Sequence, residues 1–180
     1  MAVISRTRSP QLSGLDLTLG SISWANRDNI KLEDGVFSTA VPDGPYGGWT
    51  YYLTASNFGF SIPTYDIVKG IKVEIKRKAS GGILGDYSVK LIKGGVIGGT
   101  EHGLAANWPT VNEYATYGSS TDMWGLAWDP ADINAITFGV GISVGFPWDG
   151  DGIAYIDYIK MTVYSRASIK SQLILISDDV

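Results

Sequence analysis

Residues 57–78 read NFGFSIPTYDIVKGIKVEIKRK, and the second half of this run alternates strictly between apolar and charged side chains. Ile71, Val73 and Ile75 occupy every second position, and lysine or glutamate fills the positions between them. Successive side chains of a strand point to opposite faces, so this segment has one apolar face and one charged face. We therefore expect a strand of an antiparallel sheet whose charged face meets water.

The first half of the same run also alternates, with Phe58, Phe60 and Ile62 at every second position. Pro63 follows, and proline lacks the amide hydrogen that would continue a β ladder. The pattern predicts that the chain turns at Pro63 and re-enters the core at Ile67.

The remainder of the chain repeats the period-two pattern, with Gly- and Pro-rich connections between the runs. No segment shows helical apolar spacing over three turns, so helix is expected only as single turns, as at Asp129 and Pro130. About eight to ten strands predict an all-β fold of two packed antiparallel sheets. A jelly-roll-like sandwich is preferred, and an immunoglobulin-like sandwich is the alternative, because these strands and loops are long for the latter.

The other predicted strands cover 15–24, 36–41, 49–54, 87–93, 136–144, 153–166 and 168–176, and 96–116 is expected to be a long irregular connection. In the run 136–144 the face opposite the apolar one carries only small residues, which predicts close cover by another backbone. The predicted core comprises Ile71, Val73, Ile75, Val89, Leu91, Phe138, Val140, Ile142, Ile159, Met161 and Val163.

Composition predicts one domain and excludes several classes of function. The 180 residues suffice for a self-contained core. There is no cysteine, which excludes disulfides, thiol catalysis and cysteine metal sites. A net charge of −4 argues against a nucleic-acid partner, and we expect the basic run 76–78 to be the solvated end of a strand. No apolar run has the length of a signal-peptide core or of a membrane span, so we expect assembly in a cytoplasm and no membrane partner.

The predicted organisation is an N-terminal arm at 1–14, a sandwich domain at 15–165 and a C-terminal strand or arm at 166–180. Four successive apolar residues lie in the last segment, so a strand there has no face suited to water. We expect a contact with another subunit to cover them, and folding back on the chain's own sheet is the alternative. These residues are Leu173, Ile174, Leu175 and Ile176.

Residues suited to catalysis are few. His102 is the single histidine, and it lies in a glycine-rich stretch with no nucleophile motif beside it. The Glu-x-Asp-x-Glu pattern of sandwich-fold glucanases is absent, so a pair of hydrolytic carboxylates is not indicated. We therefore expect a protein that is not an enzyme and uses no cofactor.

A metal site is not expected either. The sequence Asp149-Gly150-Asp151-Gly152 has two carboxylates at alternate positions, as in part of a calcium loop. Asp-Gly pairs are also strong signals for a hairpin turn, which is the preferred interpretation.

Six tryptophans are many for this length, and most lie near predicted loops or strand ends. Exposed aromatic rings stack on sugars, whereas buried rings seal the ends of a sandwich and interfacial rings anchor subunits. Trp108 and Trp148 are the candidates for a sugar-binding or interface role.

Several short motifs resemble a β-sandwich module of tailed-phage and prophage virion proteins, over roughly residues 24–164. The resemblance implies a fold and brings no catalytic residue with it. The motifs are Phe58-Gly59-Phe60-Ser61-Ile62-Pro63, Gly70-Ile71-Lys72-Val73-Glu74-Ile75, Trp124-Gly125, Asp132-Ile133-Asn134, Ile156-Asp157-Tyr158-Ile159 and Val163-Tyr164.

Together these patterns predict a non-enzymatic structural protein of a phage virion. The preferred role is a capsid decoration or cement protein, assembled as a homotrimer on the major capsid protein or on other virion proteins. A tail accessory protein is a second location for the same module. The alternative from another class is a carbohydrate-binding sandwich, on a tail or in a polysaccharide-degrading system.

Overall fold

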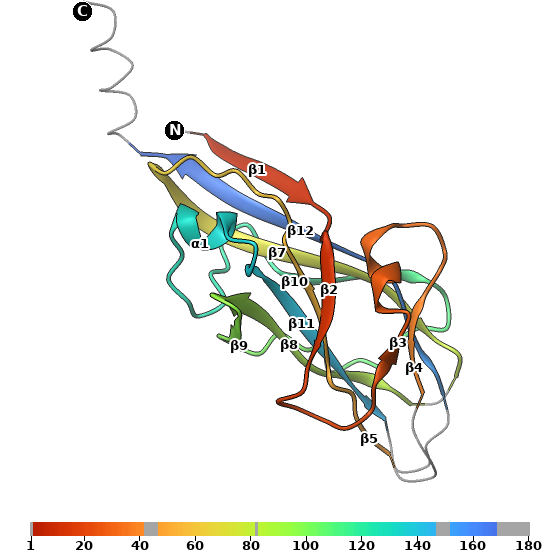
Figure 1. The fold of residues 1–180 in the computed structure, drawn as a ribbon. Helices are drawn as coiled ribbons and strands as arrows, with labels where there is room; N and C mark the ends of the chain where they lie inside the picture. The colour runs from red at the N-terminus through yellow and green to blue at the C-terminus, as the bar shows by residue number, and fades with distance from the viewer. Residues whose placement is uncertain (1, 42–46, 82, 147–151, 169–180) are drawn as a thin grey trace, which may run out of the picture.

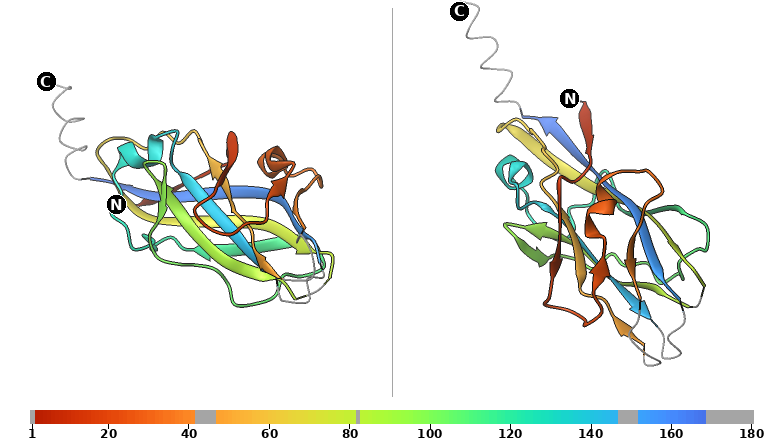
Figure 2. Two further views of the ribbon diagram at one scale, coloured as in Figure 1. Left: turned by 60° about the horizontal axis from the view of Figure 1, so that its bottom comes forward. Right: turned by 45° about the vertical axis from the view of Figure 1, so that its right-hand side comes forward.

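The computed structural model describes residues 2–41, 47–81, 83–146 and 152–168. Within these residues the fold is all β, with two antiparallel sheets packed face to face (Figures 1 and 2). The two helical elements are short, a 3₁₀ turn η1 (Arg27–Lys31) and α1 (Pro130–Asn134).

Sheet A has the strand order β10-β7-β12-β4-β3, and β1 also pairs with β12. Its two long central strands, β7 and β12, are antiparallel neighbours over most of their length. The strands are β1 (Val3–Arg8), β3 (Trp24–Ala25), β4 (Ser38–Ala40), β7 (Asp66–Ala79), β10 (Glu113–Gly118) and β12 (Ala154–Ala167).

Sheet B has the order β2-β6-β11-β8-β9, and β5 pairs with the end of β11. The apolar inner faces of both sheets form one continuous core, which contains all eleven residues predicted from the alternation. The strands are β2 (Leu12–Asp16), β5 (Gly48–Trp49), β6 (Tyr52–Ser56), β8 (Gly85–Lys93), β9 (Val96–Gly98) and β11 (Gly139–Phe146).

From β4 onward the chain passes between the sheets at nearly every connection. The order β4-β12-β7-β10 in sheet A faces β6-β11-β8-β9 in sheet B. Among the described strands of this part, only β8 and β9 are consecutive and paired with each other. This interleaving is that of the two Greek keys of a jelly roll, so the predicted jelly-roll-like sandwich is confirmed.

The central run forms β7 with its predicted faces, since Ile71, Val73 and Ile75 are completely buried. The predicted re-entry at Ile67 is wrong, because Ile67 is exposed and Val68 is buried. Ser165 pairs with Val68 and Tyr164 with Gly70, so one extra residue bulges out of β7 between them. A bulge reverses the alternation beyond it and turns Ile67 to solvent.

The position of Arg77 also differs from the prediction. The basic run 76–78 was expected to be solvated, but Arg77 occupies the inward position that follows Ile75 and is only 3% exposed. The guanidinium lies 3.2 Å from the carboxylate of Asp86, whose side chain is fully buried. The opposite charge of Asp86 therefore explains why the charged side chain of Arg77 can occupy a core position.

The aromatic segment ahead of β7 is irregular, although Phe58, Phe60 and Ile62 all point into the core as predicted. The side chain of Asn134, at the end of α1, replaces a neighbouring strand at this point. It accepts a hydrogen bond from the Ile62 amide at 2.7 Å and donates one to the Ile62 carbonyl at 2.9 Å. The single helical turn predicted at Asp129 is confirmed as α1, with a capping box.

The N-terminal residues form β1, which pairs with β12 of the same chain from Val3 opposite Arg166 to Arg8 opposite Met161 (Figure 1). Within the predicted N-terminal arm at 1–14, the described residues form β1 and the start of β2. The strand predicted at 15–24 is shorter in the structure, where β2 ends at Asp16. The stretch 96–116, predicted to be irregular, contains β9 and the start of β10 in addition to loops. The C-terminal residues Leu173, Ile174, Leu175 and Ile176 lie outside the described residues.

Replacing Ile142 with alanine should lower the free energy of unfolding by about 2–5 kcal/mol, because Ile142 is fully buried between the sheets. Urea unfolding followed by tryptophan fluorescence would measure this. Ile136, which is 65% exposed, is the matched control, and its replacement by alanine should change stability by no more than about 0.5 kcal/mol. Equal effects at both positions would contradict the placement of the core.

Candidate functional site

The outer face of sheet B carries a strip of small residues along β11. The apolar alternate positions of β11 are fully buried inside, so Gly139, Gly141, Ser143 and Gly145 take the outer side. At about 3.3 Å per residue the strip is about 20 Å long. A side-chain carbon on Gly139 would overlap the carbonyl oxygen of Ala55 on the neighbouring strand β6. The predicted cover of this face by another backbone is replaced by side chains at Gly141 and Gly145.

Side chains from the neighbouring strands lie over this strip and fill the space above its glycines. A Cβ atom on Gly141 would lie 3.0 Å from the side chain of Ile97 on β9 and 3.2 Å from the ring of Tyr52 on β6. The absence of a side chain at Gly141 therefore lets the ring of Tyr52 lie close against the backbone of β11.

Trp49 and Tyr87 form an exposed aromatic pair at one end of the strip. Trp49 is paired with Gly145 in the β5–β11 register, and Tyr87 comes from β8 on the other side of β11. The ring centroids are 4.8 Å apart with an interplanar angle of 44°, and the two residues are 47% and 43% exposed. Gly145 lies between them, since a Cβ atom added to it would be 3.7 Å from each of the two side chains. The two rings form an exposed apolar surface, which we call the aromatic platform.

A chain of hydrogen bonds runs beside the aromatic platform. Tyr52 donates to Ser88 at 2.6 Å, and Ser88 donates to the carboxylate of Glu101 at 2.5 Å. Burial, with the nearby negative charge of Glu101, raises the pKa of Tyr52, so its hydroxyl stays protonated and able to donate. Glu101 also accepts the amides of Val89 and Gly103, which fixes the loop after β9 against β8.

The other end of the strip opens into a cleft of about 280 Å³ between β2 and the β8–β9 hairpin. Its walls combine aliphatic side chains with hydroxyl groups. They include Leu12, Leu15, Asp16, Thr54, Ser56, Ile92, Ile97, Ile136 and Thr137.

The carboxylates on this face do not form a hydrolytic pair. Asp16 lies on β2 and Glu101 lies beyond β8, with β6 and β11 between those strands. At about 4.8 Å per strand spacing the backbones are more than 14 Å apart, whereas glycosidase carboxyl groups lie about 5–10 Å apart. The face therefore offers flat apolar surface and hydrogen-bonding groups, which suit binding of a polar ring compound.

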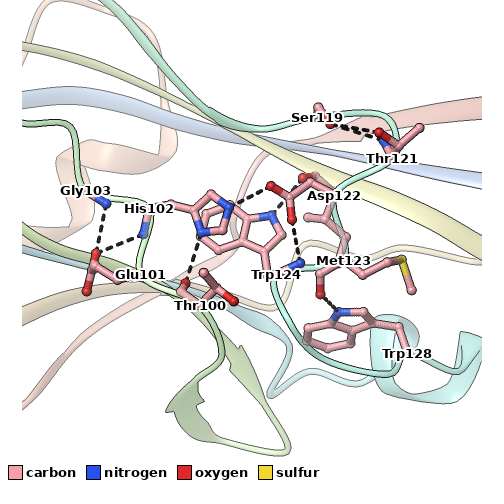
Figure 3. Close-up of polar contacts among 11 residues, drawn as sticks. Thr100, Glu101, His102, Gly103, Ser119, Thr121, Asp122, Met123, Trp124 and Trp128 are labelled. Atoms are coloured by element: carbon pink, nitrogen blue, oxygen red, sulfur yellow. Dashed lines mark hydrogen bonds and ion pairs between the residues drawn. The ribbon is translucent and has the colours of Figure 1, made fainter.

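His102 is bound on both sides of its ring (Figure 3). Its Nδ1 lies 3.0 Å from the carbonyl oxygen of Thr100, and its Nε2 lies 2.7 Å from Oδ2 of Asp122. The ring stacks on Trp124 with centroids 4.0 Å apart. Both ring nitrogens are engaged by these partners, so neither is free to activate a nucleophile. His102 thus joins two loops, and its surroundings do not support a catalytic role.

Trp108, a candidate for an exposed aromatic residue, is only 4% exposed and packs in the core, and its amide donates to the carbonyl of Leu84. Its indole donates to Asp86 at 2.8 Å, and the hydroxyl of Tyr117 donates to the same carboxylate at 2.9 Å. Burial raises the pKa of Asp86 although the Arg77 guanidinium opposes this, and burial also raises the pKa of Tyr117. Trp108 cannot stack on a sugar in this arrangement.

Several other sequence-derived candidates are not placed by the structure. Trp148, Asp149 and Asp151 lie outside the described residues, as does the apolar segment 173–176. Within the described residues no group of three or more His, Asp or Glu side chains could hold a metal ion. In the same part of the chain no helix is long and apolar enough to cross a membrane.

The aromatic platform was not identified from the sequence. Trp49 was one of six tryptophans with nothing to distinguish it, and Tyr87 was the first residue of a predicted strand. The usable signal was the row of small residues in the run 136–144, which shows where aromatic side chains from neighbouring strands can lie flat. The pairing register between separate strands decides which rings meet there, and this register cannot be read from the local sequence pattern.

Comparison with known proteins gives little further information. No family model matches the chain, and no curated protein matches it. Among solved structures, the chain is similar to CBM29_1, a family 29 carbohydrate-binding module from Piromyces equi, at 10% sequence identity over 90% of this chain and 91% of that one, with a TM-score of 0.32. A TM-score this low supports no conclusion about fold or ligand.

Replacing Asp122 with asparagine should destabilise the protein at neutral pH and have a smaller effect in acid. Burial alone would raise the pKa of Asp122, but hydrogen bonds from the Trp124 amide and His102 hold it below the ordinary value. A carboxyl whose pKa is lowered on folding adds stability above its unfolded pKa and loses it as the pH falls through the folded pKa. Unfolding free energies of both proteins from pH 7 to pH 3 should therefore converge.

Thr121→Ala is the control, because it alters the same turn and keeps the carboxylate. It should retain the pH dependence of the parent protein. A constant difference between D122N and the parent across this range would show that the His102–Asp122 contact adds no charge-dependent stability.

Proposed function

We propose that the chain is a non-enzymatic β-sandwich that binds an extended saccharide across the outer face of sheet B. The observation that carries this proposal is the aromatic platform of Trp49 and Tyr87, nearly half exposed on either side of Gly145.

The platform suits a sugar ring for a physical reason. One face of a pyranose presents mainly C–H groups, which lose water favourably against an aromatic ring, while its hydroxyls must keep hydrogen-bond partners. Trp49 and Tyr87 supply the apolar surface. The neighbouring Glu101, which is exposed, supplies carboxylate oxygen atoms whose positions are fixed by its own hydrogen bonds.

The length of the face favours a ligand of several sugar units. The platform lies at Gly145 and the cleft lies near the other end of β11, about 20 Å away. The hydroxyl groups of Thr54, Ser56 and Thr137 line that cleft. A chain of sugars bound at the platform would reach hydroxyl partners there.

Trp49→Ala and Tyr87→Ala should each weaken saccharide binding about tenfold or more, because each removes half of the stacking surface. A glycan array would identify a ligand, and isothermal titration calorimetry would give its affinity for each variant. Both side chains are nearly half exposed, so the melting temperature should change little.

Tyr65→Ala is the matched control, since Tyr65 is exposed just before β7 in sheet A, away from the platform. It should bind like the parent protein. Absence of any glycan ligand, or binding that survives removal of both platform rings, would refute the proposal.

The second candidate is a structural protein of a phage virion, as the resemblance over residues 24–164 implies. One observation favours it. β1 is one of the edge strands of sheet A, is exposed along nearly its whole length, and carries the exposed apolar residues Val3 and Ile4. Such an edge can pair with a strand of another chain. In this proposal the chain is a homotrimeric decoration or cement protein on the major capsid protein, or a tail accessory protein.

The two candidates are separated by assembly experiments. Ile4→Lys should abolish trimers in analytical ultracentrifugation and binding to capsids lacking the protein, because it places a charge in the contact. Val96→Lys, at an exposed position of β9 in sheet B, should leave both unchanged. Parent protein that remains monomeric and does not bind particles would exclude this role without affecting the saccharide proposal.

A further inference from the structure

The cleft between β2 and the β8–β9 hairpin differs in character from the aromatic platform at the other end of the same face. None of the described residues that line it is aromatic, so a sugar cannot stack there as it can on Trp49 and Tyr87. Its apolar walls are branched aliphatic side chains instead. These are Leu12, Leu15, Ile92, Ile97 and Ile136.

Three hydroxyl groups in the cleft are available to a ligand. Those of Thr54, Ser56 and Thr137 make no hydrogen bond with any residue that the structure describes. Thr54 and Ser56 are partly exposed and Thr137 is exposed, so a ligand can reach them. The hydroxyl of Thr54 lies 3.0 Å from the position of a Cβ atom on Gly14, so the residue opposite it on β2 has no side chain to cover it.

The charge of the cleft limits the ligand to neutral sugars. Asp16 is the one charged residue among the described residues that line it. One oxygen of this carboxylate accepts the amide and the hydroxyl of Thr18, and the other can accept a sugar hydroxyl. A uronic acid or a sulfated sugar would be repelled by the same carboxylate.

The aliphatic walls select among neutral sugars. An ordinary hexose ends in a hydroxymethyl group, and its hydroxyl needs a hydrogen-bond partner. Against aliphatic side chains this hydroxyl would lose water without gaining a partner, whereas a methyl group would be buried favourably. Leu12 and Ile136 are 50% and 65% exposed, so the protein leaves such apolar surface in water at this cleft.

We propose that the cleft binds a neutral 6-deoxyhexose, in which a methyl group replaces the hydroxymethyl group. The methyl group contacts the aliphatic walls, and the ring hydroxyls bind Thr54, Ser56 and Thr137. This sugar forms one end of the extended saccharide whose other end stacks on the aromatic platform. The choice of a sugar rests on the proposed saccharide function, whereas the preference for a methyl group rests on the cleft alone.

Two pairs of free sugars provide a matched test. L-Rhamnose differs from L-mannose only in this group, and L-fucose differs from L-galactose in the same way. NMR titrations that follow the methyl signals of Ile97 and Ile136 would measure binding in the cleft. We expect saturable shifts in which the deoxy sugar of at least one pair binds about tenfold more tightly than its partner.

Two variants test the two kinds of wall. Leu12→Asn keeps the approximate size of an exposed apolar residue and adds hydrogen-bonding groups, so it should abolish the preference within the pair. Thr137→Val removes a hydroxyl at nearly constant size and should weaken both sugars of the pair about threefold or more. Val96→Asn is the matched control, since Val96 is exposed on the face of β9 opposite to Ile97 and does not line the cleft. It should keep the preference.

The proposal is overturned if no sugar gives a saturable shift at Ile97 or Ile136, or if L-mannose and L-galactose bind as tightly as their deoxy partners. It is also overturned if L12N keeps the preference, or if N-acetylglucosamine, which carries its methyl group on an amide, binds more tightly than both deoxy sugars. The indole N–H signal of Trp49 reports on the platform when longer glycans are titrated. A platform that binds no glycan is therefore distinguishable from a cleft that binds no deoxy sugar.

Discussion

The antiparallel ladder between β7 and β12 is the constraint on which the rest of the structure depends. Each strand has 14 residues, and the two are paired from Ala154 opposite Ala79 to Ala167 opposite Asp66. Its inner face supplies a large part of the apolar surface that sheet B covers. Every other strand of sheet A joins an edge of this ladder directly or through β4, and its inward alternation carries Arg77 to Asp86.

Strand β11 has a comparable role in sheet B, where one sequence pattern has two structural effects. Its branched and aromatic side chains fill the core, and its outer face carries only glycines and Ser143. Aromatic residues from β5, β6 and β8 therefore occupy that face. The aromatic platform and the central core thus depend on the same eight residues.

The period-two runs were sufficient to predict the long strands and the inward residues, because both follow from local alternation. The length of the strands and loops favoured a jelly-roll-like sandwich over an immunoglobulin-like one. The bulge between Val68 and Gly70 and the burial of Arg77 were missed, since both depend on the pairing partner. The burial of Trp108 was missed for a similar reason, because its partner Asp86 lies 22 positions away. The candidate sites were largely beyond sequence reasoning, since Trp49 and Tyr87 meet only across β11.

The pairing of β1 with β12 has a consequence for synthesis of the chain. Thr7 and Thr162 share a hydrogen bond across 155 positions, so β1 is made long before its partner exists. At about 5–20 residues per second, β1 leaves the ribosome roughly ten to thirty seconds before β12 is complete. During this interval its backbone is unpaired and its apolar residues are in water. Arg6 and Arg8 place like charges on this strand, which disfavours association between nascent chains until β12 arrives.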